Sequence, residues 1–172
     1  MQFLFLNVNE ILIGILNEAQ ACKVDEAKYT ASFSFEECAD FSFDDVYYVG
    51  FNDIDGNLVF YEVRDIKRSN ASGIVSIEAE HAAFAELLEE VCEGKAVQGA
   101  TAGYAAGRIL EGSRWRIKAA DTTPIMSTTF YYKNKWECFE TIVSATNCAF
   151  YFGWTITGNV VTDRHVTVKD RQ

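Results

Sequence analysis

Apolar and polar residues alternate along most of the first 80 residues, which is the pattern of half-buried β-strands. The alternation is clearest from Tyr29 to Phe35, where every second residue is apolar. An Asp55-Gly56 pair predicts a tight hairpin, because such a turn needs a positive φ. The strands that we expect cover residues 2–8, 11–16, 19–24, 28–36, 43–51, 58–66 and 75–81. Six or seven short strands are typical of a small barrel or sandwich.

The hydrophobic period changes from two residues to that of a helix just after His81. Apolar residues then recur at helical spacing, which predicts a helix over 82–92 that ends at Gly94. Thr101 is expected to cap a second helix over 102–110, with Gly112 just beyond its end. The segment 113–123 is expected to be irregular.

The remaining residues predict mixed structure. We expect a strand over 127–132, a helix capped by Asn134, a strand over 148–154 and a turn at 157–159 that leads into a strand over 160–168. The fold class is therefore α+β. An antiparallel, β-barrel-like part covers residues 1–80, and a helical segment with a smaller mixed α+β part covers residues 81–172.

Charge is distributed unevenly along the 172 residues, whose net charge is −10. Residues 1–86 hold 16 acidic and 5 basic side chains, and no Lys or Arg lies between Lys28 and Arg64. Such a surface repels phosphate, so specific nucleic-acid binding is not expected. An acidic, solvated face that aids solubility is the simplest interpretation.

The five cysteines are an odd number and form no Cys-x-x-Cys motif. Neither a disulfide framework nor a zinc site is expected, and the thiols indicate a protein made in a reducing cytoplasm. Polar residues interrupt the apolar N-terminal run, and no stretch reaches the roughly 18 apolar residues of a membrane span. We therefore expect a soluble protein with no membrane partner.

The two histidines are the first candidates for chemistry. His81 lies on the apolar face of its strand beside Glu80, at the start of a helix, and we expect a neutral corner histidine rather than a general base. His165 lies in a β-run with no local catalytic signature. No catalytic residue is assigned.

Two further patterns suggest ligand sites and fail on inspection. The carboxylates of Asp53, Asp55 and Glu62 approach the spacing of a calcium loop, but Phe51 occupies the first ligand position and strands flank the loop. The glycines 99, 103 and 107 lack the Lys-Ser/Thr of a phosphate loop. On a helix they would form a smooth stripe for close packing. No metal or cofactor is assigned.

Aromatic residues are dense, and two adjacent pairs stand out, Tyr47-Tyr48 and Tyr131-Tyr132. On a strand, such a pair places one ring on each face, so one ring of each pair is expected to be exposed. Exposed tyrosines beside acidic residues suit sugar binding or a subunit interface.

Several segments together resemble the N-terminal region of the minor structural tail proteins of siphophages and prophages, the tail-associated lysin or prophage tail-endopeptidase group. They follow one another in the order Glu80-His81, Ile109–Trp115, Tyr131–Trp136, Cys148–Trp154 and Arg164–Val166. The resemblance covers almost the whole chain. It implies a fold similar to phage baseplate hub proteins, with β-barrel-like domains around a central channel.

The resemblance also implies the partners and the place of the protein. It implies a homotrimer in the assembled tail, next to the distal tail protein and the tape-measure protein, in a virion tail assembled in the bacterial host cytoplasm. It implies no enzyme activity in this chain, because a hydrolase or endopeptidase module would lie C-terminal to it. The acidic first half, including Asp44 and Asp45, would then line the channel and let DNA pass.

Two functions of other classes remain open. One is a carbohydrate-binding module that recognises a host surface. The other is a cell-wall hydrolase-associated domain that uses His81 or His165 with a carboxylate.

Overall fold

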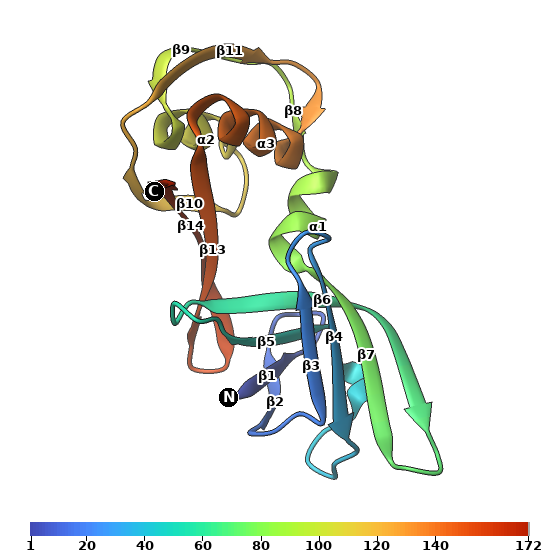
Figure 1. Ribbon diagram of the computed structural model, residues 1–172. Helices are drawn as coiled ribbons and strands as arrows, with labels where there is room; N and C mark the ends of the chain where they lie inside the picture. The colour runs from blue at the N-terminus through green and yellow to red at the C-terminus, as the bar shows by residue number, and fades with distance from the viewer. Residues whose placement is uncertain (172) are drawn as a thin grey trace. The chain divides into compact units, whose positions relative to one another are not determined.

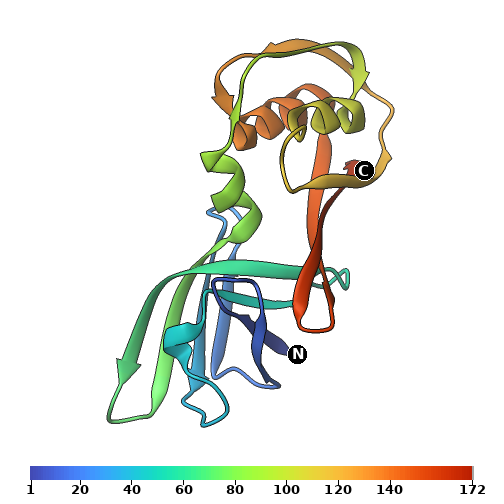
Figure 2. The same cartoon turned by 180° about the vertical axis from the view of Figure 1, so that it is seen from behind.

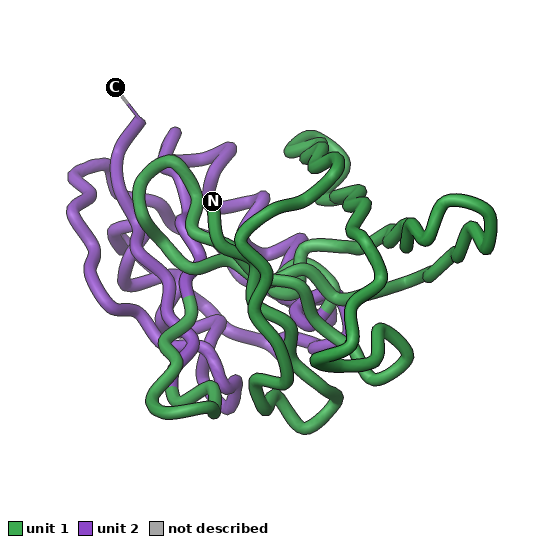
Figure 3. Tube along the Cα trace, turned by 90° about the horizontal axis from the view of Figure 1, so that it is seen from below, with its two compact units in different colours: residues 1–85, 154–162 green, residues 86–153, 163–172 purple. Residues whose placement is uncertain are grey.

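The computed structural model describes residues 1–171 and contains an α+β fold, as expected (Figure 1). By its internal contacts the chain forms two compact units. The first unit comprises residues 1–85 and 154–162, and the second comprises residues 86–153 and 163–172 (Figure 3).

The first unit is built on an antiparallel seven-stranded sheet with the order β2-β1-β5-β6-β7-β4-β3. The strands are β1 (Phe3–Leu6), β2 (Leu12–Leu16), β3 (Ala21–Asp25), β4 (Thr30–Glu36), β5 (Tyr48–Asn52), β6 (Leu58–Ser69) and β7 (Ile74–His81), with a 3-10 turn η1 (Phe43–Asp45) before β5. All seven predicted strands are thus present. Within residues 1–171, β2 and β3 do not pair with each other, so the antiparallel part is confirmed but it is not a closed barrel.

Phenylalanines fill the core of this unit. The strict alternation in β4 sends Phe33 and Phe35 to one face, where they lie opposite Ile77 and Val75 of β7. Phe5 of β1 packs edge-on against Phe35, with ring centroids 5.0 Å apart. Edge-to-face aromatic pairs of this kind add about 0.5–1.5 kcal/mol beyond the area that they bury.

Acidic residues of the stretch between Lys28 and Arg64 form ion pairs with arginines of strand β6. The Arg68 guanidinium lies 2.7 Å from Asp44 and 3.3 Å from Glu37. Arg64 pairs in the same way with carboxylates on β6 and β7, those of Glu62 and Glu80. The negative charge of this segment is therefore partly neutralised by residues that follow it in the chain.

The second unit contains α2 (Ala102–Ile109) and α3 (Lys135–Thr146), and α1 (Ala82–Glu89) crosses the boundary between the units. Both predicted caps are confirmed. The Thr101 hydroxyl accepts from the Tyr104 amide, and the Asn134 side chain accepts from the Glu137 amide at 2.8 Å. Helix α3 ends at Thr146, and its C-cap residue Asn147 has a φ of 52°.

Strands β9 (Lys95–Thr101) and β11 (Ile125–Phe130) form an antiparallel ribbon that runs over α2 and α3, as Figures 1 and 2 both show. The short strands β8 (Val91–Cys92) and β12 (Lys133–Asn134) pair beside the start of α3. A third sheet has the order β10-β14-β13, with the bounds β10 (Arg116–Asp121), β13 (Cys148–Thr157) and β14 (Val160–Asp170). The hairpin of β13 and β14 contributes its tip to the first unit.

Three local predictions in this half were wrong. The segment 113–123 is not irregular, because it contains β10, which pairs in parallel with β14. The first helix ends at Glu89, and its expected last turn is strand β8. The strand expected over 127–132 ends at Phe130, so the two following tyrosines lie between β11 and β12.

Candidate functional site

The Glu80-His81 joint lies where β7 passes into α1, as predicted. His81 lies opposite Tyr61 of β6, and the two rings meet edge-on with centroids 5.5 Å apart. The Trp154 ring lies on another side, at 5.8 Å. The neighbouring Glu80 carboxylate is bound by Arg64 at 3.1 Å.

Burial among these rings lowers the pKa of His81 to about 4, because an apolar environment disfavours the imidazolium. The imidazole is therefore neutral at physiological pH, as the sequence predicted. The dominant cause is burial rather than the helix N-terminus that we had expected. This histidine serves as a packed corner of the first unit.

The second histidine takes part in a polar cluster of the second unit. His165 Nδ1 lies 3.1 Å from Asp163 Oδ2, and Arg116 binds both oxygens of Asp163 at 2.8 and 2.9 Å. The Arg116 hydrogen bonds lower the pKa of Asp163, and His165 adds to the effect. Asp163 and His165 share one face of β14, and Arg116 reaches them from β10.

A His-Asp pair of this kind is the geometry that orients a general base. The other side of the His165 ring, however, is packed on the backbone of Gly153. A side chain at position 153 would collide with Nε2. Because His165 is only 7% exposed, its contacts are those of a residue that ties β13, β14 and β10 together.

The Asp53 carboxylate accepts hydrogen bonds within the 53–57 loop itself. Asp53 Oδ1 accepts from the amides of Asp55 and Asn57 at 2.9 and 2.8 Å, and Gly56 has a φ of 79°. Glu62 lies on β6, where it accepts from the Tyr47 hydroxyl at 3.1 Å. The predicted hairpin is confirmed. Within residues 1–171, no group of three or more His, Cys, Asp or Glu side chains is placed to hold a metal ion.

The glycine stripe is present in part. Gly103 and Gly107 lie in α2, and both face strand β10. A methyl group on Gly103 would collide with the Ala120 side chain, so the helix approaches the strand closely there. Gly99 is not part of the helix; it lies in β9 with a φ of 56°. The stripe therefore serves packing inside the second unit.

The tyrosine pairs differ from each other in exposure. Tyr47 is 37% exposed, and its hydroxyl is held by Glu62. Tyr131 and Tyr132 are 65% and 66% exposed, with ring centroids 4.4 Å apart. The expectation of one exposed ring was wrong for this second pair, because the strand has already ended at Phe130. Tyr132 has a φ of 51°, a backbone conformation that bulky residues rarely adopt.

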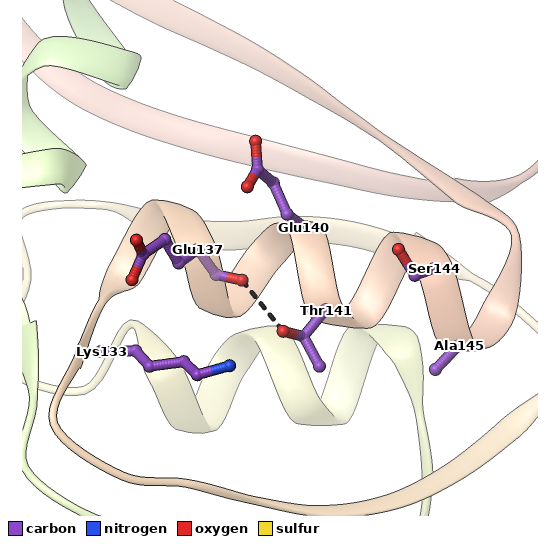
Figure 4. Close-up of a pocket in the computed structure, with 6 residues that line it drawn as sticks. All are labelled: Lys133, Glu137, Glu140, Thr141, Ser144 and Ala145. Atoms are coloured by element: carbon purple, nitrogen blue, oxygen red, sulfur yellow. Dashed lines mark hydrogen bonds between the residues drawn. The ribbon is translucent and has the colours of Figure 1, made fainter.

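A shallow groove of about 650 Å³ begins at the residue after this pair and follows the solvent face of α3. Its wall carries one ammonium, two carboxylates and two hydroxyls, those of Lys133, Glu137, Glu140, Thr141 and Ser144. Figure 4 shows Glu137 and Glu140 projecting from the helix, and the Thr141 hydroxyl donating to the Glu137 carbonyl at 3.1 Å. This groove was not predicted from the sequence. The i, i+3, i+4, i+7 spacing of its helical polar residues was the available signal.

No family model and no curated protein matches the chain. Among solved structures, the chain is similar to the tail protein from Neisseria meningitidis MC58, with 9% sequence identity and a TM-score of 0.49. The match covers 97% of this chain and 44% of the Neisseria chain, so this chain spans less than half the length of that protein.

No helix within the described residues 1–171 has both the length and the apolar character needed to cross a membrane. The longest, α3, has 12 residues.

Proposed function

We propose that this protein is a structural component of a phage or prophage tail tip or baseplate hub, which acts through assembly contacts and not through catalysis. The observation that carries the proposal is the ordered series of five sequence segments that resemble minor structural tail proteins. The segments lie at the β7–α1 joint, the end of α2, the turn before α3, strand β13 and strand β14. They therefore span both compact units.

One of the two edges of the large sheet, strand β2, supports a role in assembly. Strand β3 carries Lys23 and Asp25, and charged edge strands discourage pairing with other chains. Strand β2 carries no charge, and Ile15 on it is 46% exposed. The turn between β13 and β14 covers the first residue of β2, because the Leu12 amide donates to the Asn159 carbonyl at 2.7 Å. Beyond Leu12, this apolar edge is suited to receive a strand of a neighbouring subunit.

In the proposed assembly the chain is part of a homotrimer that contacts the distal tail protein and the tape-measure protein, in a virion tail assembled in the host cytoplasm. The acidic first unit would line the channel, where phosphates find few cations. Asp44 is paired with Arg68, so the reversal Asp45→Lys is a more direct test of this lining than a change at Asp44. Slower genome ejection is the expected result, and unchanged ejection would contradict the lining.

Complementation of a deletion strain tests the proposal. Ile15→Lys on β2 should abolish the formation of infectious particles, because it places a charge on the proposed pairing edge. Val24→Lys on β3 is the matched control, since that edge is already charged and Val24 is similarly exposed. Normal titres with both variants would argue against assembly through β2, and normal titres in the uncomplemented strain would refute the tail function itself.

Carbohydrate binding is a second candidate, favoured by the exposed Tyr131-Tyr132 pair next to the polar groove on α3. Tyrosine rings present a flat apolar surface with a polar tip, and carboxylates accept hydrogen bonds from sugar hydroxyls. NMR titration with soluble cell-wall glycan fragments tests it. Shifts that disappear in Tyr131→Ala/Tyr132→Ala but persist in Tyr104→Ala, an equally exposed control, would support this function. An absence of shifts in the unsubstituted protein would exclude it for those glycans.

A further inference from the structure

Two buried cysteines of the second unit lie on neighbouring elements. Cys92 is the last residue of β8 and is 2% exposed, and Cys138 lies one turn into α3 and is 0% exposed. Strand β8 pairs with β12, which leads directly into α3, and Cys92 lies opposite Lys133 in that pairing. The Lys135 amide donates to the Glu90 carbonyl at 2.8 Å, so the first turn of α3 is held against β8.

Side-chain contacts reinforce this arrangement. The Lys135 ammonium lies 2.9 Å from the Glu90 carboxylate, on the buried side of α3. Cys138 follows Lys135 by three residues and therefore lies on the same side of the helix. Burial raises the pKa of Cys138 to about 12, and the neighbouring Cys92 thiol adds to the effect. The two thiols are thus close neighbours in the folded unit.

We propose that Cys92 and Cys138 are a latent disulfide, reduced in a thiol-rich cytoplasm and closed by exchange with a low-molecular-weight disulfide such as oxidised glutathione. The thiolate of one cysteine attacks the glutathione disulfide and releases one glutathione thiolate. The second cysteine attacks the mixed disulfide and releases the other. Two protein thiols are oxidised, one glutathione disulfide is reduced to two thiols, and the two protons pass to the released glutathione.

The third buried cysteine of this unit is not a competing partner. Cys148 follows the C-terminal end of α3, and Cys138 lies near its beginning. With a rise of about 1.5 Å per residue, the two are separated by about 12 Å along the helix. A disulfide requires Cα atoms within about 7 Å. Cys138 therefore cannot pair with Cys148, and the bond that it forms with Cys92 would link α3 to β8.

Formation of the Cys92–Cys138 disulfide is slow in the folded state at neutral pH. The thiolate is the attacking species, and the raised pKa keeps Cys138 protonated. Both thiols are also shielded from solvent. Exchange therefore proceeds through local opening of the α3 start, and it is faster at pH 9 than at pH 7.

Oxidation and peptide mapping test the proposal on the full chain. Cys22 is exposed and Cys38 is half-buried, so both are first replaced by Ser to remove competing reactions. After incubation with oxidised glutathione at pH 9 in dilute urea, mass spectrometry of a non-reducing digest should find Cys92 joined to Cys138 with the loss of two hydrogens. The melting temperature should rise by several degrees, and dithiothreitol should reverse the rise.

Two variants complete the experiment. Cys148→Ser should retain the linkage and the shift in melting temperature, and Cys138→Ser should lose both. A linkage that includes Cys148, or only glutathione adducts on single cysteines, or thiols that stay free throughout, would each overturn the proposal. The digest of the parent protein identifies the linked cysteines directly, so the proposal is tested even if Cys138→Ser does not fold.

Discussion

His81 makes the stability of the first unit sensitive to acid. Its pKa falls from 6.5 to about 4 on burial, so the folded unit resists protonation that the unfolded chain accepts. A shift of about 2.5 pKa units corresponds to about 3 kcal/mol, at about 1.4 kcal/mol per unit. Because the folded pKa is depressed, this contribution is complete above pH 6.5 and is lost as the pH falls from 6.5 to 4.

Two measurements check this magnitude. The chain has only two histidines, so an NMR titration gives two imidazole signals, and His165→Gln assigns them. The His81 signal should stay that of a neutral ring down to about pH 4. Urea unfolding between pH 4 and pH 8 should then show a loss of stability that is about 3 kcal/mol larger for the parent protein than for His81→Gln.

A core substitution without a titratable group is the control. Ile77→Val lies on the same strand, is fully buried, and should cost about 1 kcal/mol at every pH. Ile77→Val should therefore lower the free energy of unfolding equally at every pH, without changing its dependence on pH. If His81→Gln also gave a profile parallel to that of the parent, or if the His81 signal titrated near pH 6.5, the buried-imidazole argument would be refuted.

Two further predictions concern the second unit, and urea unfolding measures both. Gly103→Ala should destabilise the unit by about 1–3 kcal/mol, because the added methyl group collides with Ala120. Gly107→Ala meets only an ordinary contact at 3.8 Å and should stabilise the unit by up to about 1 kcal/mol through its higher helix propensity. Equal effects of the two substitutions would contradict the close approach of α2 to β10 at Gly103. Glu90→Ala should cost about 3 kcal/mol, because it leaves the buried Lys135 ammonium with the Glu111 carbonyl at 3.3 Å but without a carboxylate. Lys135→Met should be close to neutral. A neutral Glu90→Ala would show that Lys135 does not depend on this ion pair.

Local chemistry explains which elements the sequence predicted. Strand β4 follows from strict alternation, and the starts of α2 and α3 follow from Thr101 and Asn134, whose side chains satisfy helix amides only a few residues away. The hairpin at Asp55-Gly56 is local in the same sense. These elements depend on contacts within a few residues, so the printed sequence contains all of the information that they need.

Elements that depend on distant partners were missed. Strand β10 is largely exposed and has no apolar alternation. It is a strand because it pairs with β14, about 48 residues further along the chain. The open edges of the large sheet likewise follow from strand order, which no local pattern records. The two-residue spacing of Asp163 and His165 could be read from the sequence. The position of Arg116 next to Asp163 could not, because the two residues are 47 positions apart in the chain.

Deletion of the gene in the organism that carries it, followed by electron microscopy of the particles released on induction, tests the tail assignment most directly. We predict capsids without complete tails, and labelled antibody against the chain should mark the tail tip in the parent particles. Infectious particles of normal length that lack the protein would contradict this assignment.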